Sequence, residues 1–584
     1  MNEEPKNNWT KSWLYAWLII FAVVVAILIP LSLTADNNRS VTKGVIDAFP
    51  EIMVIGIVTA SVIVGLWVFI LWLRCWKNFR KFLFALACLF TLLLLAYAEE
   101  DWRTKRALEK FMSQQEAKGE QFDLLSIAPP AVPDDQNFAM APIWVESLKA
   151  SNPKAAQQFF GTNYAEDGQT DFVDRLSMST TYNDQDGPAL GSWQKATLTD
   201  LRPWQDYYRQ LASKTKLFPV PLSPQSPAQD VLLALSKYDP AIEELRQASA
   251  LPYAQFSVDY AFQPPAEILL PHLAKLRRVD GALNLRAIAE LQNGQTDKAL
   301  ADIKLSFRLM DSARLEPFLI SHLVRLAMWQ TTLQPIYEGL ANHQWSGAQL
   351  TDMDSQLAKI DFLADYQHSL AGEQALEFAN TEYLRRTGNA SMFDYSDGNH
   401  NDQFKSLVFR LLPGAFFYQN ELTMLQLNQE YALSIVDVQG HSVSPSVVQK
   451  DNEAESKVLS HLSYGTVMAR WLLPSFGTAV KKSAYAQEFV DLARVAIALE
   501  RYRRNTGVYP DSLDVLAPNL IDEVPHDVIN GDPLHYHHTN DGRFILYSVG
   551  WNQKDDGGKI SANGHSFSTV DINQGDWVWR YPAN

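Results

Sequence analysis

The stretch "YSVGWNQKDDGG", from Tyr547 to Gly558, places two adjacent carboxylates, Asp555 and Asp556, beside a pair of glycines at the exit of a predicted strand. Carboxylate, amide and backbone carbonyl oxygens are the ligands that calcium prefers. Adjacent like charges also repel unless solvent or a cation offsets them. The stretch is therefore either a tight glycine turn with solvated acids or a cation loop, and the residues alone leave both alternatives open.

Histidines form the second set of side chains that could do chemistry. In "HYHH", His535 and His537 face one side of a predicted strand and His538 faces the other. Two imidazoles can begin a zinc or copper site, but no third ligand accompanies them, so a polar strand face is favoured. The remaining candidates each stand alone on a predicted helix and are interpreted as structural histidines: His322, His368 and His461.

Motif searches supply no reaction. The polar loop 388–403 carries four side chains that could bind a metal, although a solvated loop is favoured because no ligand spacing is recognisable: Asp394, Asp397, His400 and Asp402. The patterns G-x-S-x-G, H-E-x-x-H and G-x-x-x-x-G-K-[ST] do not occur. No catalytic residue is therefore assigned, and the chain is not predicted to be an enzyme.

The elements that must position the acidic stretch form a predicted α+β module over residues 484–584. A helical apolar face is spaced three and four residues apart, with an end at Gly507: Phe489, Leu492, Ala496, Leu499 and Tyr502. "PLHYHHT" and "RFILYSVG" flank the turn "NDG" and predict an antiparallel hairpin.

This order of helix, "G-x-YP", "VP-x-D", "G-x-P-x-x-Y", "YS-x-G" and acidic glycine turn resembles the C-terminal domain of the major pseudopilin of the type II secretion system. The resemblance implies a calcium loop whose side-chain ligands would be Asn552, Asp556 and Asp571. Asn552 departs from the pattern, because a neutral amide stands where that loop has an aspartate. The chain is not predicted to be a pilus subunit, since this helix begins near Ala484, far from the N-terminus.

Three apolar segments in residues 12–98 are predicted to cross a membrane: 12–35, 52–73 and 82–98. For the first segment a signal peptide is the rival interpretation, and its length and the second span that soon follows argue against it. For the short third segment the alternative is an interfacial or buried hairpin helix. Residues 1–11 would then be a tail ahead of the spans.

Basic residues predict the orientation of these segments. The loop between the second and third spans carries four cations and no acid: Arg74, Lys77, Arg80 and Lys81. Such loops stay in the cytoplasm. The N-terminus is therefore predicted to be cytoplasmic, and everything after about Glu99 to lie outside, in the periplasm of a bacterium with two membranes.

Residues 99–200 are predicted to be irregular, beginning with an extended, proline-containing strap that docks through apolar anchors. The strap pattern "KGE–LD–APP–VPD–NF" resembles a family of bacterial envelope proteins with N-terminal membrane spans, to which no activity is attached. Residues 201–483 show helical periodicity. Residues 283–310 resemble one tetratricopeptide-like helical hairpin, but an ordinary bundle is favoured because no second copy is found.

Composition limits the class of function. The 584 residues carry a formal net charge of -16, with 47% hydrophobic and 20% charged residues. An acidic chain without a basic stripe is a poor candidate for nucleic-acid binding. The two cysteines, Cys75 and Cys88, both lie in the membrane region. The favoured hypothesis is a periplasmic scaffolding or binding protein, anchored in the inner membrane, with an unknown envelope protein as partner. The alternatives are an envelope hydrolase and an accessory component of a type II secretion or pilus-like system.

Overall fold

The computed structural model describes residues 9–34, 41–151, 174–181, 187–389, 402–461, 463–472, 476–562 and 570–582. The chain divides into two compact units, Met1–Glu100 and Asp101–Asn584. The first unit contains apolar helices, and the second contains the remaining helices and all of the described strands. Most of the candidate chemistry predicted from the sequence therefore lies in the second unit.

The first unit supports two of the three predicted membrane spans. It holds α1 (Trp9–Thr34), α2 (Val41–Leu73) and the first part of α3 (Trp76–Glu116). Among the described residues, the stretches Met53–Leu73 and Trp76–Glu116 are long and apolar enough to cross a membrane. In α1 the apolar stretch found among the described residues, Trp13–Ile27, is shorter than these two. The prediction of a span at 12–35 is not supported.

The second unit begins with the polar end of α3 and then the proline-containing segment, which docks on the helical body. Its elements are α4 (Leu124–Ile127), the 3-10 turns η1 (Asp134–Gln136) and η2 (Phe138–Met140), and α5 (Pro142–Ser151). Asn137 holds the segment in place: its amide donates to the carbonyl of Gln255 at 2.7 Å and its Oδ1 accepts from the Gln255 N–H at 2.9 Å. Phe138 is fully buried, whereas Leu125, another apolar residue of the segment, is exposed.

The helical body follows as α7 (Arg202–Ala212), α8 (Pro227–Leu235), α9 (Asp239–Ala248), α10 (Pro271–Gln292), α11 (Thr296–Asp311), α12 (Leu319–Ala341), α13 (Gly347–Leu357), α14 (Phe362–Thr387), α15 (Asp402–Leu411), α16 (Gly414–Leu427), α17 (Pro445–Ser460) and α18 (Ala469–Leu472). The hairpin predicted over 283–310 is formed by α10 and α11, and Gly294 turns the chain between them with φ +72°. Glycine suits this left-handed conformation because it lacks a Cβ.

Short elements join these helices: η5 (Trp193–Lys195), η6 (Ser236–Tyr238), η7 (Pro265–Glu267), the π-helical turn η9 (Asn428–Ala432), η10 (Leu433–Ile435), and the strands β1 (Val436–Asp437) and β2 (Ser442–Val443). Serine caps begin two of the helices. Ser226 and Ser346 each accept a bond from the backbone N–H three residues on, and a glutamine at that position returns a bond to the cap, as the sequence pattern of a capping box predicts.

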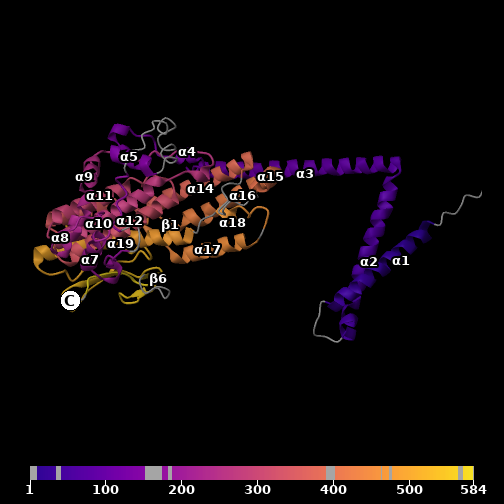
Figure 1. Ribbon diagram of the computed structural model, residues 1–584. Helices are drawn as coiled ribbons and strands as arrows, with labels where there is room; N and C mark the ends of the chain where they lie inside the picture. The colour runs from indigo at the N-terminus through magenta and orange to yellow at the C-terminus, as the bar shows by residue number, and fades with distance from the viewer. Residues whose placement is uncertain are drawn as a thin grey trace, which may run out of the picture. The chain divides into compact units, whose positions relative to one another are not determined.

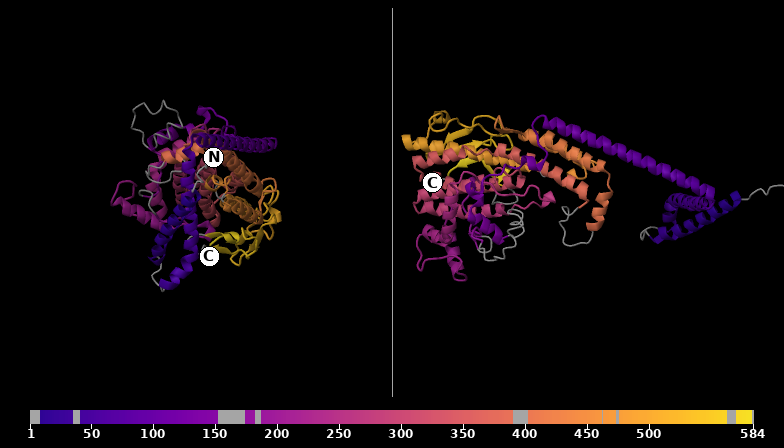
Figure 2. Two further views of the ribbon diagram at one scale, coloured as in Figure 1. Left: turned by 90° about the vertical axis from the view of Figure 1, so that its right-hand side faces the viewer. Right: turned by 90° about the horizontal axis from the view of Figure 1, so that it is seen from above.

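The C-terminal elements surround one long helix, α19 (Phe476–Thr506), which ends at Gly507 with φ +89°. They are η11 (Leu513–Leu516), β3 (His535–His538), β4 (Phe544–Ser548), β5 (Ile560–Ala562), β6 (Val570–Gly575) and β7 (Trp577–Arg580). The predicted hairpin is confirmed: β3 and β4 pair antiparallel with His535 opposite Tyr547, and β7 adds to the other edge of β4. Figures 1 and 2 show the body helices on one side of α19 and these strands on another.

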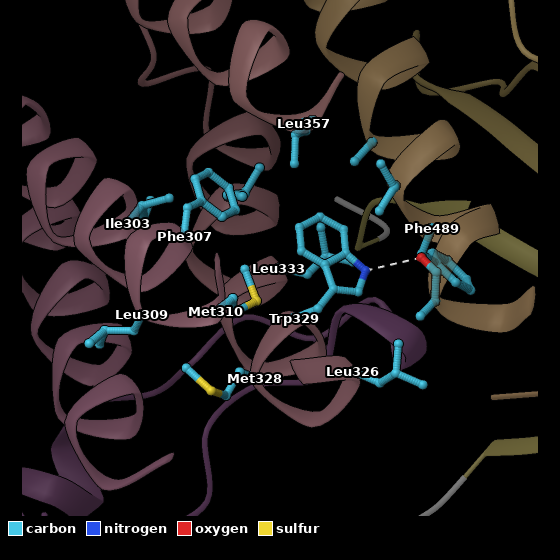
Figure 3. Packing of buried hydrophobic residues seen from close by; sticks show 14 of the residues in the cluster. Ile303, Phe307, Leu309, Met310, Leu326, Met328, Trp329, Leu333, Leu357 and Phe489 are labelled. Carbon is cyan, nitrogen blue, oxygen red and sulfur yellow. Dashed lines mark hydrogen bonds between the residues drawn. The ribbon is translucent and has the colours of Figure 1, made fainter. Parts of the chain in front are cut away.

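One hydrophobic core runs through the second unit from Leu124 to Tyr581. Trp329 of α12 lies between Phe307 of α11 and Phe489 of α19, and its indole N–H donates to the carbonyl of Ala486 at 3.1 Å (Figure 3). The segments predicted as separate domains, 99–200, 201–483 and 484–584, therefore share a core and form one compact unit. The physical reason is that α19 is buried between the helices and the strands, so neither side covers it alone.

Candidate functional site

Asp576, between β6 and β7, organises the acidic turn. Its side chain is 1% exposed and accepts backbone N–H bonds from Asp556 at 3.0 Å, Gly558 at 2.7 Å and Lys559 at 3.2 Å. Gly557 and Gly558 have φ near +70°, which lets the backbone curve around the carboxylate. Burial raises the pKa of Asp576, and the three backbone donors oppose that rise.

The structure brings two of the three predicted calcium ligands together. The Asn552 amide donates to Asp556 Oδ2 at 2.9 Å, and Lys554 Nζ lies 3.6 Å from Asp556 Oδ1. Asp571 Oδ1 instead accepts from the backbone and side-chain amides of Asn573, at 2.9 and 2.7 Å. Within the described ranges no three His, Cys, Asp or Glu side chains gather as a metal site. The described contacts fit a self-contained glycine turn, and calcium binding remains a prediction.

The "HYHH" histidines serve strand packing. His535 stacks on Tyr547 with ring centroids 4.8 Å apart, and His538 Nε2 lies 2.8 Å from the carbonyl oxygen of Pro510. The Tyr547 hydroxyl in turn donates to Asp555 Oδ1 at 3.1 Å. These contacts agree with the interpretation of a polar strand face. Of the second metal candidate, the loop 388–403, residues 390–401 lie outside the described residues.

His322 and Ser483 lie in contact in the core, but they do not form the accessible nucleophile and general base of a hydrolase. His322 Nε2 lies 2.8 Å from Ser483 Oγ, and the Ser483 hydroxyl donates to the carbonyl of Ala479 at 3.0 Å. Both side chains are closed from solvent. Burial lowers the pKa of His322, with Arg325 adding to the effect, so the imidazole stays neutral. The pair joins α12 to α19, as expected for a structural histidine.

A hollow of about 660 Å³ in the helical body gathers cations from five parts of the chain. We call it the basic pocket, and six basic side chains line it: Arg246, Lys304, Arg308, Arg314, Arg325 and Lys359. One acid, Asp311, lines it with them. The volume falls in the range of small-molecule sites, and the lining is cationic in a chain with a formal net charge of -16.

Helix α11 supplies one wall of the basic pocket. Lys304, Arg308 and Asp311 are spaced four and three residues apart, which places them on one face of the helix. Arg308 is anchored by donating to the carbonyls of Leu251 and Tyr253 at 2.5 and 2.9 Å. Burial lowers its pKa and Asp311 opposes the shift. The side chain is thus fixed at the wall and remains a cation.

Carboxylates outside the lining hold three further cations. Arg246 Nη2 pairs with the buried Asp302 at 2.6 Å, and Lys304 Nζ pairs with Asp352 at 2.8 Å. Arg325 Nη1 lies 2.8 Å from an oxygen of Asp365. These ion pairs fix the positions of the three basic groups and offset part of their charge.

The floor and the rim of the basic pocket differ in character. Six apolar side chains lie among the lining residues: Ala301, Leu305, Phe307, Met310, Ile360 and Phe362. At the exposed side, Arg314 is held only by Asp311, with Nε at 3.4 Å, and Lys359 takes part in no ion pair within the described residues. A ligand here would meet an apolar surface and two cations that are loosely held or unpaired.

The linear sequence carries little signal for this pocket. The face of α11 is visible as periodicity, but Arg246, Arg325 and Lys359 come from α9, α12 and the turn after α13. Only the packing of these helices brings them within one hollow. A prediction of a basic site would have required the tertiary contacts.

Asn552 lines a second and more open hollow of about 900 Å³ between α17, α19 and the C-terminal turns. Its lining includes Trp551, Lys481 and several amide side chains.

Comparisons of the chain with protein-family models, with curated proteins and with solved structures found no match. The resemblances described from the sequence therefore remain predictions.

The acidic turn generates a test of its two alternatives. Asp576→Asn should lower the thermal midpoint of the full-length protein, because an amide N–H₂ would face N–H donors, at a cost of about 1–3 kcal/mol. The matched control Asp511→Asn, at a fully exposed carboxylate, should leave the midpoint unchanged. A self-contained glycine turn predicts equal midpoints in calcium and in chelator. A midpoint raised by calcium, and lowered again by Asp571→Ala, would establish the cation loop instead.

Proposed function

We propose that the chain is a membrane-anchored binding protein whose second unit takes an anionic ligand in the basic pocket. The observation that carries the proposal is the convergence of six cations on one hollow of a chain that is acidic as a whole. A concave site lined by one sign of charge concentrates ligands of the opposite sign. The sequence-based hypothesis of a binding protein thereby gains a candidate ligand class.

The lining defines the chemistry of that ligand. Arginine and lysine recognise phosphate, sulfonate and carboxylate groups, with arginine able to bind two oxygens at once. Phe307, Phe362 and Ile360 provide an apolar surface beside those charges. The best fit is an organic anion with two acidic groups on a flat or apolar body, rather than an extended polyanion, since the cations gather in one hollow.

We place the second unit outside the cytoplasm, with the anchor in the inner membrane of a bacterium; the N-terminus is cytoplasmic in this arrangement because the segment 12–35 also crosses the membrane in it. The support is the cluster of cations from Arg74 to Lys81, in the turn after α2 and the first turns of α3, which favours retention of that segment in the cytoplasm. An envelope protein as a further partner and a calcium-stabilised C-terminal turn complete the proposal. Neither contributes to ligand binding in the basic pocket.

Two other functions rank below this one. An envelope hydrolase would need an accessible nucleophile, and the Ser483–His322 pair is buried with its serine donating to backbone. A role beside a type II secretion or pilus-like system rests only on the resemblance of residues 484–584 to a pseudopilin. A shared module does not carry the function of its system.

Binding of naphthalene-1,5-disulfonate tests the pocket, because this probe has two anionic groups on an apolar ring. Calorimetry on the full-length protein in a nonionic detergent should show saturable binding that weakens from 0.05 to 0.5 M salt, a prediction of roughly tenfold from charge screening. The double variant Arg314→Glu/Lys359→Glu should raise the Kd by about tenfold or more, equivalent to roughly 1.4 kcal/mol.

The control for that experiment is Lys216→Glu, a charge reversal at an exposed lysine outside the pocket lining, which should leave the Kd unchanged. Inorganic pyrophosphate separates charge from apolar contact and should bind more weakly than the disulfonate. Equal affinities for the wild type and the double variant would contradict the proposed function.

Fusions to the C-terminus of the full chain test the orientation. Alkaline phosphatase, which is active only outside the cytoplasm, should be active there because the cations of the 74–81 segment keep that loop inside. A green fluorescent protein that fluoresces only in the cytoplasm should be dark at the same position. The reverse pair of results would overturn the proposed localisation.

A further inference from the structure

The end of the second unit where the chain enters it carries an exposed apolar and aromatic surface. Four side chains project there: Leu407, Val408 and Leu411 from α15, and Trp471 from α18. Leu411 is 72% exposed and Trp471 is 59% exposed. Arg410 and Arg470, exposed neighbours in the sequence, add positive charge. We call these six residues the entry surface.

Packing on α16 holds the two helices of the entry surface at the same end. Phe416, in the first turn of α16, shares one hydrophobic cluster with Phe409 and Leu412 near α15 and with Met468 and Leu472 near α18. Asn420 fixes α18 by accepting the Met468 N–H at 2.9 Å. Figure 1 shows α15, α16 and α18 gathered at one end of the unit. The exposed apolar side chains are therefore presented by a rigid support.

The chain enters the second unit at this same end. Asp101 Oδ1 accepts the backbone N–H of Ala415 at 2.5 Å, at the start of α16. A Cβ on Gly414 would lie 3.3 Å from the Asp101 carboxylate, so the small residue permits the close approach. Further along, Leu108 packs in the cluster of Leu422 and Leu425. Asp101 to Leu108 thus run parallel to α16, and Asp101, the first residue of the unit, lies at the start of that helix.

The residues before Asp101 belong to an apolar helical stretch long enough to cross a membrane. The apolar sequence ends at Ala98, three residues before Asp101, which is about 4.5 Å of helix. A surface attached so closely to the end of a span lies within reach of the interfacial layer of the bilayer. Tryptophan, leucine and arginine are the side chains that favour this layer.

We propose that the entry surface docks on the bilayer, with Leu407, Leu411 and Trp471 inserted among the lipid headgroups and Arg410 and Arg470 at the lipid phosphates. The inference rests on the membrane anchor of the proposed function and adds a second membrane contact that would hold the folded unit against the surface. This contact explains why apolar side chains are exposed on a rigid support next to a membrane span.

The test attaches the environment-sensitive dye NBD to the entry surface in vesicles. Leu411→Cys is made in a Cys75→Ser/Cys88→Ser background, since these are the two cysteines of the chain. The full-length protein is reconstituted in vesicles of phosphatidylethanolamine and phosphatidylglycerol, and anchoring is measured separately by flotation. NBD at residue 411 should emit at shorter wavelength than in water and should be quenched by lipids spin-labelled near the headgroup.

The matched control is Ile320→Cys in the same background, an exposed apolar residue on α12 outside the entry surface, which should give water-like emission and no quenching. Trp471→Cys should repeat the result of residue 411. A protein that floats with the vesicles but shows water-like, unquenched NBD at residues 411 and 471 would overturn the docking surface alone. A protein that does not float would overturn the anchor and the docking surface together.

Discussion

The burial of α19 is the constraint on which the second unit depends. This helix is buried on all sides along its middle: Val490, Val495 and Ala496 are all buried even though they face different directions. The helices α12, α13 and α14 cover one part of it, and β4 and β7 cover another. Because a helix with this pattern must be surrounded, the helical body and the C-terminal strands require each other.

Buried polar side chains of α19 form hydrogen bonds both with the helical body and with the C-terminal segment. These bonds fix the position of α19 along its axis. Gln487 accepts the Phe362 N–H at 2.8 Å from the helical side, and Glu488 accepts the Val528 N–H at 2.9 Å from the C-terminal side. Burial raises the pKa of Glu488 strongly, so losing the Val528 bond would leave a buried acid unpaired. The first of these bonds also sets the start of α14, where Phe362 lines the basic pocket.

Local signals predicted much of this architecture. Three features could be predicted from the sequence: the end of α19 at Gly507, the β3–β4 hairpin and the α10–α11 turn at Gly294. They could be predicted because glycine conformation and hydrophobic periodicity are properties of short stretches. The sharing of one core was not predicted, since it depends on what covers each face of α19. The basic pocket escaped prediction for the same reason: Arg246, Arg325 and Lys359 become neighbours only through packing. Asp576 was visible as an acid, but its three backbone donors depend on the fold.

Native-state hydrogen exchange on the full-length protein tests directly whether α19 joins the two sides into one cooperative unit. Peptides covering residues 484–499 should be among the most protected, and they should open with the same free energy as peptides from α12 and from β4. Such equal values would mean that the helical body and the strands unfold together. If residues 484–581 exchanged at a distinctly lower free energy while α12 stayed protected, the C-terminal segment would be an independent module, and the account of a shared core would be contradicted.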